Sequence, residues 1–246
     1  MRRVFEVFYT LVATPAILLV AFLVGTFGVL PFAPMPRGRR ERYTIRPAML
    51  FSQAVTRILL ATVDVTGRVQ LKDERGALVI SNHRSWFDPL LLIAHTGSNG
   101  LSKSIIFWIP FVGFYGWLAG AVFFDRSSRE ARAAARDEVL MLVRSGARVH
   151  IFPEGTRTRD GTLAERVFLT LIRDCYDAGL PVVPCAVMHT ERVFPIDMPV
   201  LSPGRSCRVD VGCAMYPEDH ESAEAFAIAA WDDVKAKVRA LEQESD

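Results

Sequence analysis

The hydrophobic pattern of the chain begins with a long apolar stretch near the N-terminus. No charged residue occurs from position 7 to position 36, and apolar side chains are densest between residues 11 and 32. A helix needs roughly 20 apolar residues to cross the hydrocarbon core of a bilayer, so this stretch is long enough. It also exceeds the apolar region of a typical cleaved signal peptide and lacks a clear cleavage site. We therefore predict an N-terminal hydrophobic helical segment that anchors the protein to a membrane.

Two arrangements of this anchor fit the sequence. One is a helix that spans the bilayer, and the other is a re-entrant or monotopic anchor, in keeping with the interruptions at Pro15, Gly25, Gly28 and Pro31. Basic residues flank the stretch on both sides, and the heavier cluster follows it at positions 37, 39, 40 and 42. Basic flanks favour the cytoplasmic side, so we expect the part of the chain after the anchor to be cytoplasmic.

After the anchor the pattern changes twice. Residues 46–63 form an apolar-rich stretch with a narrow polar face, which predicts a helix that either packs on a core or lies at the membrane interface. From about residue 64, short apolar runs alternate with amphipathic stretches, which is typical of strands alternating with helices. We therefore predict a membrane anchor and interfacial helix over residues 1–63 and a catalytic domain over residues 64–246.

The alternating region predicts an α/β fold with a largely parallel sheet flanked by helices. We expect strands at residues 77–80, 121–124, 149–152, 182–188 and 209–214. Ser127 and Glu130 match a capping box that would open a helix reaching about residue 144. Further helices are expected at residues 165–178, ended by Gly179, and at residues 221–242.

Composition narrows the class of protein. Half of the 246 residues are hydrophobic, mean hydropathy is +0.21 and the formal net charge is only +2, so the charge gives no reason to expect a nucleic-acid partner. The four cysteines lack paired or metal-type spacing, and we expect them to be reduced core residues. The histidines also lack the spacing of metal ligands, so we assign no metal site.

Candidate chemistry begins directly after the apolar run 77–80, where His83 and Asp88 are five residues apart. Neither a helix nor a strand brings two side chains at this spacing together, so the chain must turn between them. Pro89 favours such a turn, because proline biases the preceding residue away from helical geometry and suits the first turn of a helix. We expect Asp88 to be an N-cap whose carboxylate reaches back to His83. Such a carboxylate fixes the tautomer of the ring and leaves the other nitrogen free to accept a proton.

Two other polar stretches follow predicted strands. Asp125 and Arg126 follow the run 121–124, and the segment 152–157 reads Phe-Pro-Glu-Gly-Thr-Arg. Taken alone, the first fits a surface ion pair and the second an ordinary tight turn. Parallel sheets, however, place their ligand sites at the carboxyl ends of strands, and guanidinium groups suit phosphate. Together the three stretches predict one site with a base and two phosphate-binding arginines.

These residues carry a resemblance to a known family. The chain resembles the glycerolipid acyltransferases, specifically the 1-acyl-sn-glycerol-3-phosphate (lysophosphatidic acid) acyltransferases of bacteria. The similarity covers about residues 64–215, and its first and third motifs are the specific ones. Four motifs match in order: Asn-His-x-x-x-x-Asp at 82–88, Gly-x-x-x-x-x-Arg at 120–126, Phe-Pro-Glu-Gly-Thr-Arg at 152–157 and an apolar-Pro-apolar strand at 183–185.

The resemblance implies a reaction and roles for these residues. His83 would be the general base and Asp88 would orient it, whereas Ser85 as a nucleophile is the less favoured alternative. The acyl group would pass from acyl-CoA or acyl-carrier protein to the sn-2 hydroxyl of 1-acyl-glycerol-3-phosphate, forming phosphatidic acid. No cofactor is implied beyond this co-substrate. Arg126 and Arg157 would hold the acceptor phosphate. The pocket around it would be shaped by Glu154, Gly155 and Thr156.

The resemblance also implies a place in the cell and partners. We expect the cytoplasmic face of the inner membrane, a lipid acceptor, an acyl thioester donor and contact with the membrane surface. One departure concerns the acceptor: the family commonly has an aromatic and basic Phe-Lys-x-Gly segment where this chain has residues 163–168. Acceptors such as a lyso-ornithine lipid are therefore an alternative, as is a non-catalytic lipid-binding protein on the same fold. The aromatic stretch 108–117 is consistent with a wall for the acyl chain or a membrane contact, but we favour ordinary core.

Overall fold

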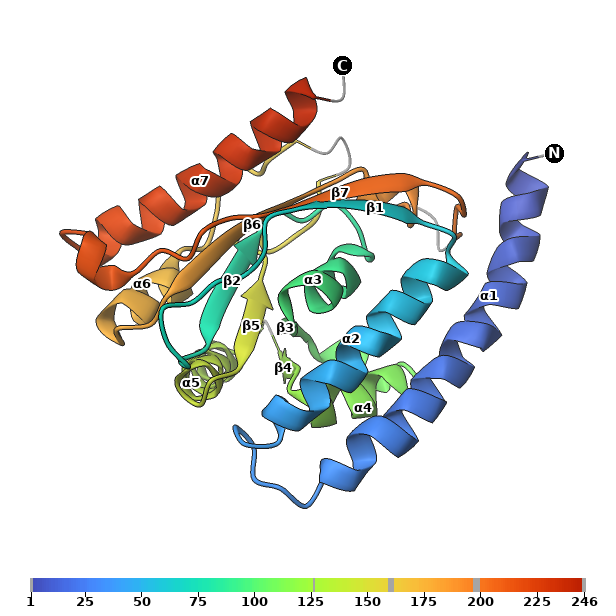
Figure 1. The fold of residues 1–246 in the computed structure, drawn as a ribbon, viewed down its shortest axis with the longest axis horizontal. Coiled ribbons are helices and arrows are strands. Elements are labelled where there is room, and N and C mark those ends of the chain that lie inside the picture. Colours follow the sequence, from blue (N-terminus) through green and yellow to red (C-terminus); the bar gives the residue numbers. More distant parts are fainter. Residues whose placement is uncertain (1, 126, 159–161, 197–199, 245–246) are drawn as a thin grey trace.

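The computed structural model describes residues 2–125, 127–158, 162–196 and 200–244, which form a sheet with helices on both faces (Figure 1). Within these residues one sheet has the strand order β1-β7-β6-β2-β5-β3-β4. All neighbouring strands are parallel except β6 and β7, which confirms the predicted α/β fold. The strands are β1 (Thr62–Thr66), β2 (Ala77–Ser81), β3 (Ser98–Lys103), β4 (Val122–Phe124), β5 (Arg148–Ile151), β6 (Val182–Met188) and β7 (Ser206–Val211).

Three features of the sheet differ from the sequence prediction. Strand β3 was not predicted, because its sequence Ser-Asn-Gly-Leu-Ser-Lys has neither an apolar run nor an alternating pattern. Strand β1 was not predicted either, and it begins at Thr62, so it crosses the boundary placed between residues 63 and 64. Strand β7 lies earlier than the predicted range 209–214, because residues 212–214 leave the ladder after Val211.

The helices also follow the predicted order, with corrected ends. Ser128 rather than Ser127 caps α5, since its hydroxyl accepts the Ala131 N–H. Ser127 instead donates to Asp125. Residues 165–169 are not helical, so α6 is shorter than predicted. The α-helices of the described residues are α1 (Arg2–Val24), α2 (Glu41–Ile58), α3 (Asp88–Thr96), α4 (Val112–Ala119), α5 (Arg129–Arg144), α6 (Thr170–Asp177) and α7 (Ala223–Gln243).

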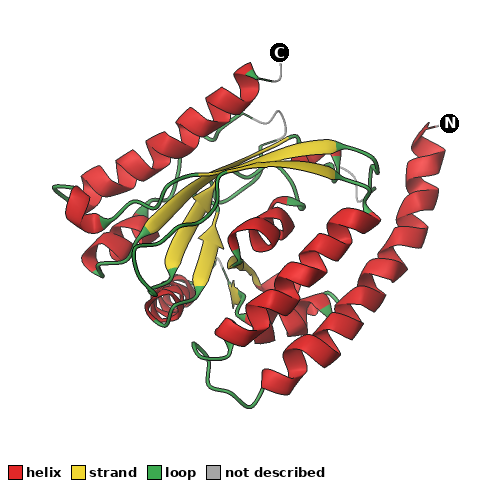
Figure 2. Cartoon of the chain, in the orientation of Figure 1, coloured by secondary structure: helices red, strands yellow, loops and turns green. Residues whose placement is uncertain are grey.

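Strand β2 lies at the centre of the hydrophobic core and has buried side chains on both faces. Leu78 and Ile80 face a cluster that includes residues of α5, α6 and α7. Ala77 and Val79 face the other cluster, which includes residues of α1, α2 and α3. Figure 2 shows the helices that cover the two faces of the sheet. All four side chains are fully buried. A strand covered on both faces reads as a continuous apolar run, which is why the sequence predicts this strand well.

The apolar stretch at the N-terminus forms one long helical segment. Helix α1 continues through a π-helical turn (Gly25–Val29) and a 3₁₀ turn (Leu30–Phe32). By length and composition alone, this segment (Arg2–Phe32) is sufficient to cross a membrane, and little of it is buried in the protein. It lies alongside α2, which packs between α1 and α3 (Figure 1). Many large apolar side chains on its outer surface are exposed, among them Phe5, Phe8, Leu11, Phe22 and Phe27.

Both ends of this helical segment are attached to the layered domain. Near its start, Thr10 accepts the Leu201 N–H through its hydroxyl, at 2.9 Å. Beyond its end, Arg37 forms an ion pair with Glu138 of α5, with 2.7 Å between Nε and Oε1. Arg42 donates to the Ser145 carbonyl from two nitrogens. The basic cluster therefore also holds the chain between α1 and α2 against α5.

The aromatic segment 108–117 is more exposed than predicted. Trp108 is 77% exposed, and Phe111, Phe114 and Trp117 are each about two-fifths exposed. The ring of Phe111 contacts the ring of Phe22 on α1 edge to face, with 5.3 Å between centroids. The expectation that this segment is mainly core is wrong, because its aromatic side chains extend the apolar surface of α1 instead of entering the layered core.

His150 of β5 is a buried histidine close to the predicted site. It is 1% exposed, and its Nδ1 lies 3.0 Å from the Ser98 hydroxyl. Burial lowers the pKa of His150 to about 4, and the backbone of Ser98 only partly opposes this shift. The ring is therefore neutral in the folded protein at pH 7. In the unfolded chain the ring would take a proton near pH 6.5.

We predict that His150 makes the protein acid-sensitive. Because the folded-state pKa is depressed, acidification below pH 6.5 protonates the unfolded chain first and favours it. Relative to His150→Gln, the wild type should lose about 2 kcal/mol of unfolding free energy between pH 7.5 and pH 5. Urea unfolding of both proteins in the same detergent measures this difference. A difference that stays constant with pH would contradict the assignment.

Candidate active site

The predicted site lies where β2 and β5 end, at the same edge of the sheet. These strands are parallel neighbours, so the segments that follow them, 82–88 and 152–157, leave the sheet side by side. Asn82 fixes the first segment through its side-chain amide, which donates to the Val187 carbonyl at 2.9 Å and accepts the Val187 N–H at 2.8 Å. Asn82 thereby continues the pairing of β2 with β6 for one more residue.

His83 and Asp88 form the pair that the sequence predicts. The Nδ1 atom of His83 lies 2.8 Å from Oδ2 of Asp88, and the carboxylate is fully buried. The same oxygen accepts the backbone N–H groups of Arg84 at 2.6 Å and Ser85 at 2.7 Å. Because Nδ1 is engaged, Nε2 is the ring nitrogen available to take a proton.

The expectation that Asp88 caps the following helix is wrong. Asp88 is the first residue of α3, but its hydrogen bonds run back to the preceding turn and to His83. Its other oxygen, Oδ1, is buried and has no hydrogen-bond partner among the described residues. The carboxylate therefore stabilises the turn that brings His83 and Asp88 together. It does not cap α3.

The imidazole of His83 is also held by an aromatic ring. It stacks on Phe152, with 3.9 Å between ring centroids and 12° between planes. The His83 side chain remains 16% exposed, so a substrate can reach it. The hydroxyl of Ser85 donates to the Phe194 carbonyl and accepts the Phe87 N–H. Ser85 is therefore occupied by structural bonds, which weighs against a nucleophilic role.

Glu154 links the segment 152–157 to the segment 82–88 through its side chain. Its Oε1 accepts the backbone N–H of His83 at 2.7 Å, and its Oε2 accepts that of Ala164 at 2.9 Å. Burial raises the pKa of Glu154, and these two N–H groups oppose the rise by favouring the carboxylate. Glu154 thus affects the site by fixing the backbone of His83 and of a later segment.

The next residues turn the chain outward. Gly155 has a φ of +67°, a conformation that favours glycine, and Thr156 is exposed. The guanidinium carbon of Arg157 lies 3.9 Å from the centroid of the Trp86 ring. The Nη1 atom of Arg157 is buried but has no hydrogen-bond partner among the described residues. Burial lowers the pKa of Arg157, whereas the charge of Asp88 raises it.

The second predicted arginine, Arg126, lies outside the described residues. Its neighbour Asp125 accepts hydrogen bonds on Oδ1 from the backbone and the hydroxyl of Ser127. The glycine that opens this motif, Gly120, has a φ of +114° and its backbone lies against the side chain of Glu41. That glycine is therefore required where the end of α4 packs against the start of α2.

The segment that departs from the family pattern packs on the third motif. The Phe168 N–H donates to the Pro153 carbonyl at 2.8 Å, and a side chain at Gly155 would meet the Phe168 ring. The guanidinium of Arg166 lies over the same ring, 5.6 Å from its centroid. These contacts, together with the bond from Ala164 to Glu154, place residues 164–168 beside the site.

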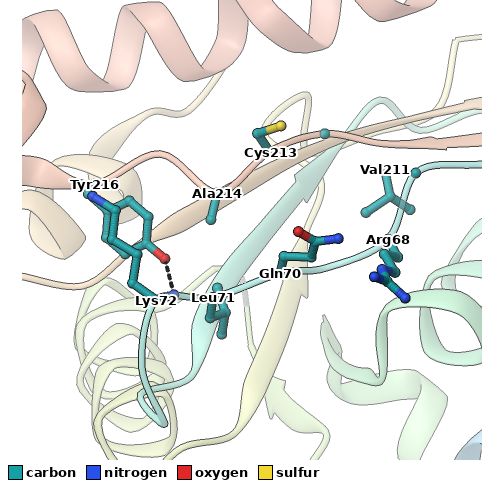
Figure 3. A pocket seen from close by; sticks show the side chains of 10 residues that line it. Arg68, Gln70, Leu71, Lys72, Val211, Cys213, Ala214 and Tyr216 are labelled. Carbon is teal, nitrogen blue, oxygen red and sulfur yellow. Dashed lines mark hydrogen bonds between the residues drawn. The ribbon is translucent and has the colours of Figure 1, made fainter.

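A pocket of about 710 Å³ lies away from this site (Figure 3). Its lining includes Lys72, Cys213 and Tyr216. Residue 215, next to Tyr216, pairs with Val182 at the start of β6, whereas His83 follows the end of β2. The pocket is therefore not the predicted site.

Cys213 is exposed, which corrects the expectation that all four cysteines are core residues; the other three are buried.

Two functional candidates were not identified from the sequence. Trp86 occupies a position inside the first motif to which the family pattern gives no role, and only the fold places it against Arg157. Phe152 belongs to the third motif, but its stacking on His83 depends on the pairing of β2 with β5. The sequence signal that could have identified both residues is their aromatic character within two otherwise polar motifs.

Comparison with known proteins identifies the class. Residues 62–188, slightly more than half of the chain, match the family described as Acyltransferase. The chain belongs to this acyltransferase family. The sequence resemblance to the family is therefore confirmed, and the positions of the motifs at the ends of β2 and β5 agree with it.

Individual relatives match about half to three quarters of the chain. A 1-acyl-sn-glycerol-3-phosphate acyltransferase of Borreliella burgdorferi is 31% identical over 133 residues, 53% of this chain and 52% of that protein. One from Neisseria meningitidis serogroup B is 32% identical over 136 residues, 54% of this chain and 53% of that protein. A chloroplastic one from Arabidopsis thaliana is 28% identical over 200 residues, 78% of this chain and 54% of that protein. The chain thus spans about half the length of these curated relatives.

A solved structure shares the fold over the whole chain. The 1-acyl-sn-glycerophosphate acyltransferase from Thermotoga maritima superimposes with a TM-score of 0.82, at 23% identity and over 98% of both chains. At this identity the likeness establishes the fold, including the long N-terminal helix and the layered domain.

We predict that the Glu154 carboxylate is needed to hold the site together. Glu154→Ala would leave two backbone N–H groups without acceptors, each at a cost of about 1–3 kcal/mol if both stay buried. Glu154→Gln keeps one acceptor oxygen and should lose less. Urea unfolding measures both, with exposed Glu165→Ala as the matched control. Equal stability of Glu154→Ala and the control would contradict this role.

Proposed function

We propose that the protein transfers an acyl group from a thioester to the sn-2 hydroxyl of 1-acyl-glycerol-3-phosphate, forming phosphatidic acid. The observation that carries this proposal is the 2.8 Å contact between Nδ1 of His83 and Oδ2 of Asp88. It supplies a base of fixed tautomer in a chain that belongs to the acyltransferase family. The curated relatives named above, which act on this acceptor by their names, support the choice of acceptor.

The chemistry needs one base and two bound substrates. Nε2 of His83 takes the proton of the acceptor hydroxyl. At the same time the hydroxyl oxygen attacks the carbonyl carbon of the thioester. The carbon–sulfur bond then breaks, the thiolate leaves with the electron pair, and the proton on Nε2 can pass to it. The Asp88 carboxylate stabilises the imidazolium that forms between these steps. A thioester is already activated, so no covalent acyl-enzyme is required, in agreement with the engaged hydroxyl of Ser85.

The acceptor phosphate is assigned to the arginines of two motifs. Arg157 lies near the catalytic pair and has a buried N–H donor to which no described residue offers an acceptor. A guanidinium binds phosphate with paired N–H donors, which suits this position. We assign Arg126 to the same phosphate from its place in the second motif, and Gly155 and Thr156 to the wall of the pocket. The donor is acyl-CoA or acyl-carrier protein, and no other cofactor is required.

We infer that the protein binds one face of the membrane without crossing it. The helical segment from residue 2 to residue 32 is attached to the layered domain near its start by Thr10 and beyond its end by Arg37. A helix held to the domain at both ends cannot cross the bilayer while the domain stays on one side. Its exposed apolar surface, continued by Phe111, suits insertion into one leaflet. We place the protein on the cytoplasmic face of the inner membrane.

An acceptor panel tests this function. Purified protein in mixed micelles is given 1-oleoyl-glycerol-3-phosphate, a lyso-ornithine lipid or 1-oleoylglycerol, each with palmitoyl-CoA or palmitoyl-acyl-carrier protein. We expect phosphatidic acid as the main product. His83→Ala should lower kcat about 10²–10⁴-fold, because general-base help is lost. His95→Gln, which changes a histidine in the last turn of α3, is the matched control and should keep wild-type turnover.

The panel also separates the alternatives. Preferential acylation of the lyso-ornithine lipid would replace the proposed acceptor while keeping the reaction. Binding of lysolipids without turnover would favour the non-catalytic lipid-binding protein. Full turnover by His83→Ala would contradict the catalytic assignment.

A further inference from the structure

The contact between Trp86 and Arg157 joins two motifs. Trp86 lies in the turn between β2 and α3, and Arg157 lies after β5. The guanidinium carbon is 3.9 Å from the centroid of the indole ring, which is the distance of direct stacking. Among the described residues no hydrogen bond fixes the Nη1 atom of Arg157, although this atom is buried. The aromatic face is thus the contact that defines where the guanidinium lies.

Stacking on an aromatic face leaves the N–H donors of the Arg157 guanidinium available for hydrogen bonds. A guanidinium is planar and carries its five N–H donors in the plane, whereas an aromatic ring contacts the face. A carboxylate partner would instead occupy the in-plane donors and compete with a phosphate. The nearby carboxylate of Asp88 does not do so: its Oδ2 is engaged by His83, Arg84 and Ser85, and its Oδ1 has no hydrogen-bond partner among the described residues.

The backbone that presents Trp86 is firmly held. On one side, the N–H of Ser85 donates to Asp88 and its hydroxyl donates to the Phe194 carbonyl. On the other side, the N–H of Phe87 donates to the Ser85 hydroxyl, and the Phe87 side chain is fully buried. The indole between them is 41% exposed, so it extends outward from a fixed turn. The same turn places the carboxylate against His83.

We propose that Trp86 is a positioning residue of the acceptor site. Its indole holds the guanidinium of Arg157 face-on beside His83, so that the in-plane N–H donors remain free for the phosphate of the acceptor. The turn fixed by Asp88 therefore sets two distances at once, that of the base to the acceptor hydroxyl and that of the phosphate-binding group to the base. This inference rests on the proposed function, because it assumes that the acceptor carries a phosphate bound by Arg157.

A double-mutant cycle tests the proposal. The proteins are wild type, Trp86→Leu, Arg157→Ala and the double variant, with Trp86→Phe as the variant that keeps an aromatic face. Trp86→Met is a second non-aromatic variant in case Trp86→Leu folds poorly. Lys72→Met is the matched control, because it removes a cation stacked on Tyr216 at 4.0 Å, beside the start of β6. For each protein, kcat and the KM values of 1-oleoyl-glycerol-3-phosphate and of the thioester donor are measured.

We expect Trp86→Leu to raise the acceptor KM about 2- to 30-fold, the range that corresponds to loss of one cation–π contact. The donor KM and kcat should change less than about twofold, and Trp86→Phe should recover most of the acceptor KM. In the Arg157→Ala background the change at Trp86 should have little further effect, because the contact is already absent. A merely structural role would not produce this dependence.

Three outcomes would overturn the inference. The first is an effect of Trp86→Leu that is equally large with and without Arg157. The second is an equal rise in the KM values of donor and acceptor. The third is no effect of Trp86→Leu although Arg157→Ala raises the acceptor KM, which would leave the proposed function standing. Absence of turnover by wild type on the phosphate-bearing acceptor would instead remove the proposed function and this inference together.

Discussion

One carboxylate oxygen, Oδ2 of Asp88, is hydrogen-bonded to three groups, and the local structure of the site depends on these three bonds. Two of them are backbone N–H groups of the turn, from Arg84 and Ser85, and the third group is the ring of His83 at 2.8 Å. The same charge thus shapes the turn and orients the imidazole of His83. Removing water from a carboxylate is costly unless hydrogen bonds replace it, and the three bonds to Oδ2 offset part of that cost for Asp88.

Polar residues of the motifs mostly hold one another in place. Asn82 pairs with the backbone of Val187, which joins the end of β2 to β6. Glu154 pairs with the backbone of His83, which joins the segment after β5 to the segment after β2. The site therefore rests on the three central strands, whose side chains are buried on both faces of the sheet.

Much of the fold was predictable from the sequence, and the reason is burial. Strand β2 and strand β6 are continuous apolar runs because helices cover both faces, and such runs are recognisable. Strand β3 was not predictable, because its side chains are mostly polar or absent and its pairing with β5 is set by the tertiary fold. The start of α6 was also misjudged, because residues 164–168 contact the third motif instead of forming a helical turn.

For the site, the sequence indicated which residues matter but not how they act. The meeting of His83 with Asp88 was predictable, since the spacing demanded a turn and Pro89 favoured one. The predicted capping role of Asp88 was wrong, because its carboxylate is hydrogen-bonded to N–H groups of the preceding turn. The stacking of Trp86 on Arg157 joins residues about seventy positions apart, and no local pattern encodes it. Arg126, outside the described residues, stays a prediction.

The most direct test of the central claim is the kcat of Asp88→Asn, measured with saturating acceptor and donor on protein whose fold is verified by near-ultraviolet circular dichroism. Asparagine keeps an oxygen for the backbone N–H groups but carries no charge to stabilise an imidazolium. The account predicts a fall in kcat of about 10²–10⁴-fold with acceptor and donor KM values little changed. A folded Asp88→Asn protein with wild-type kcat would contradict it.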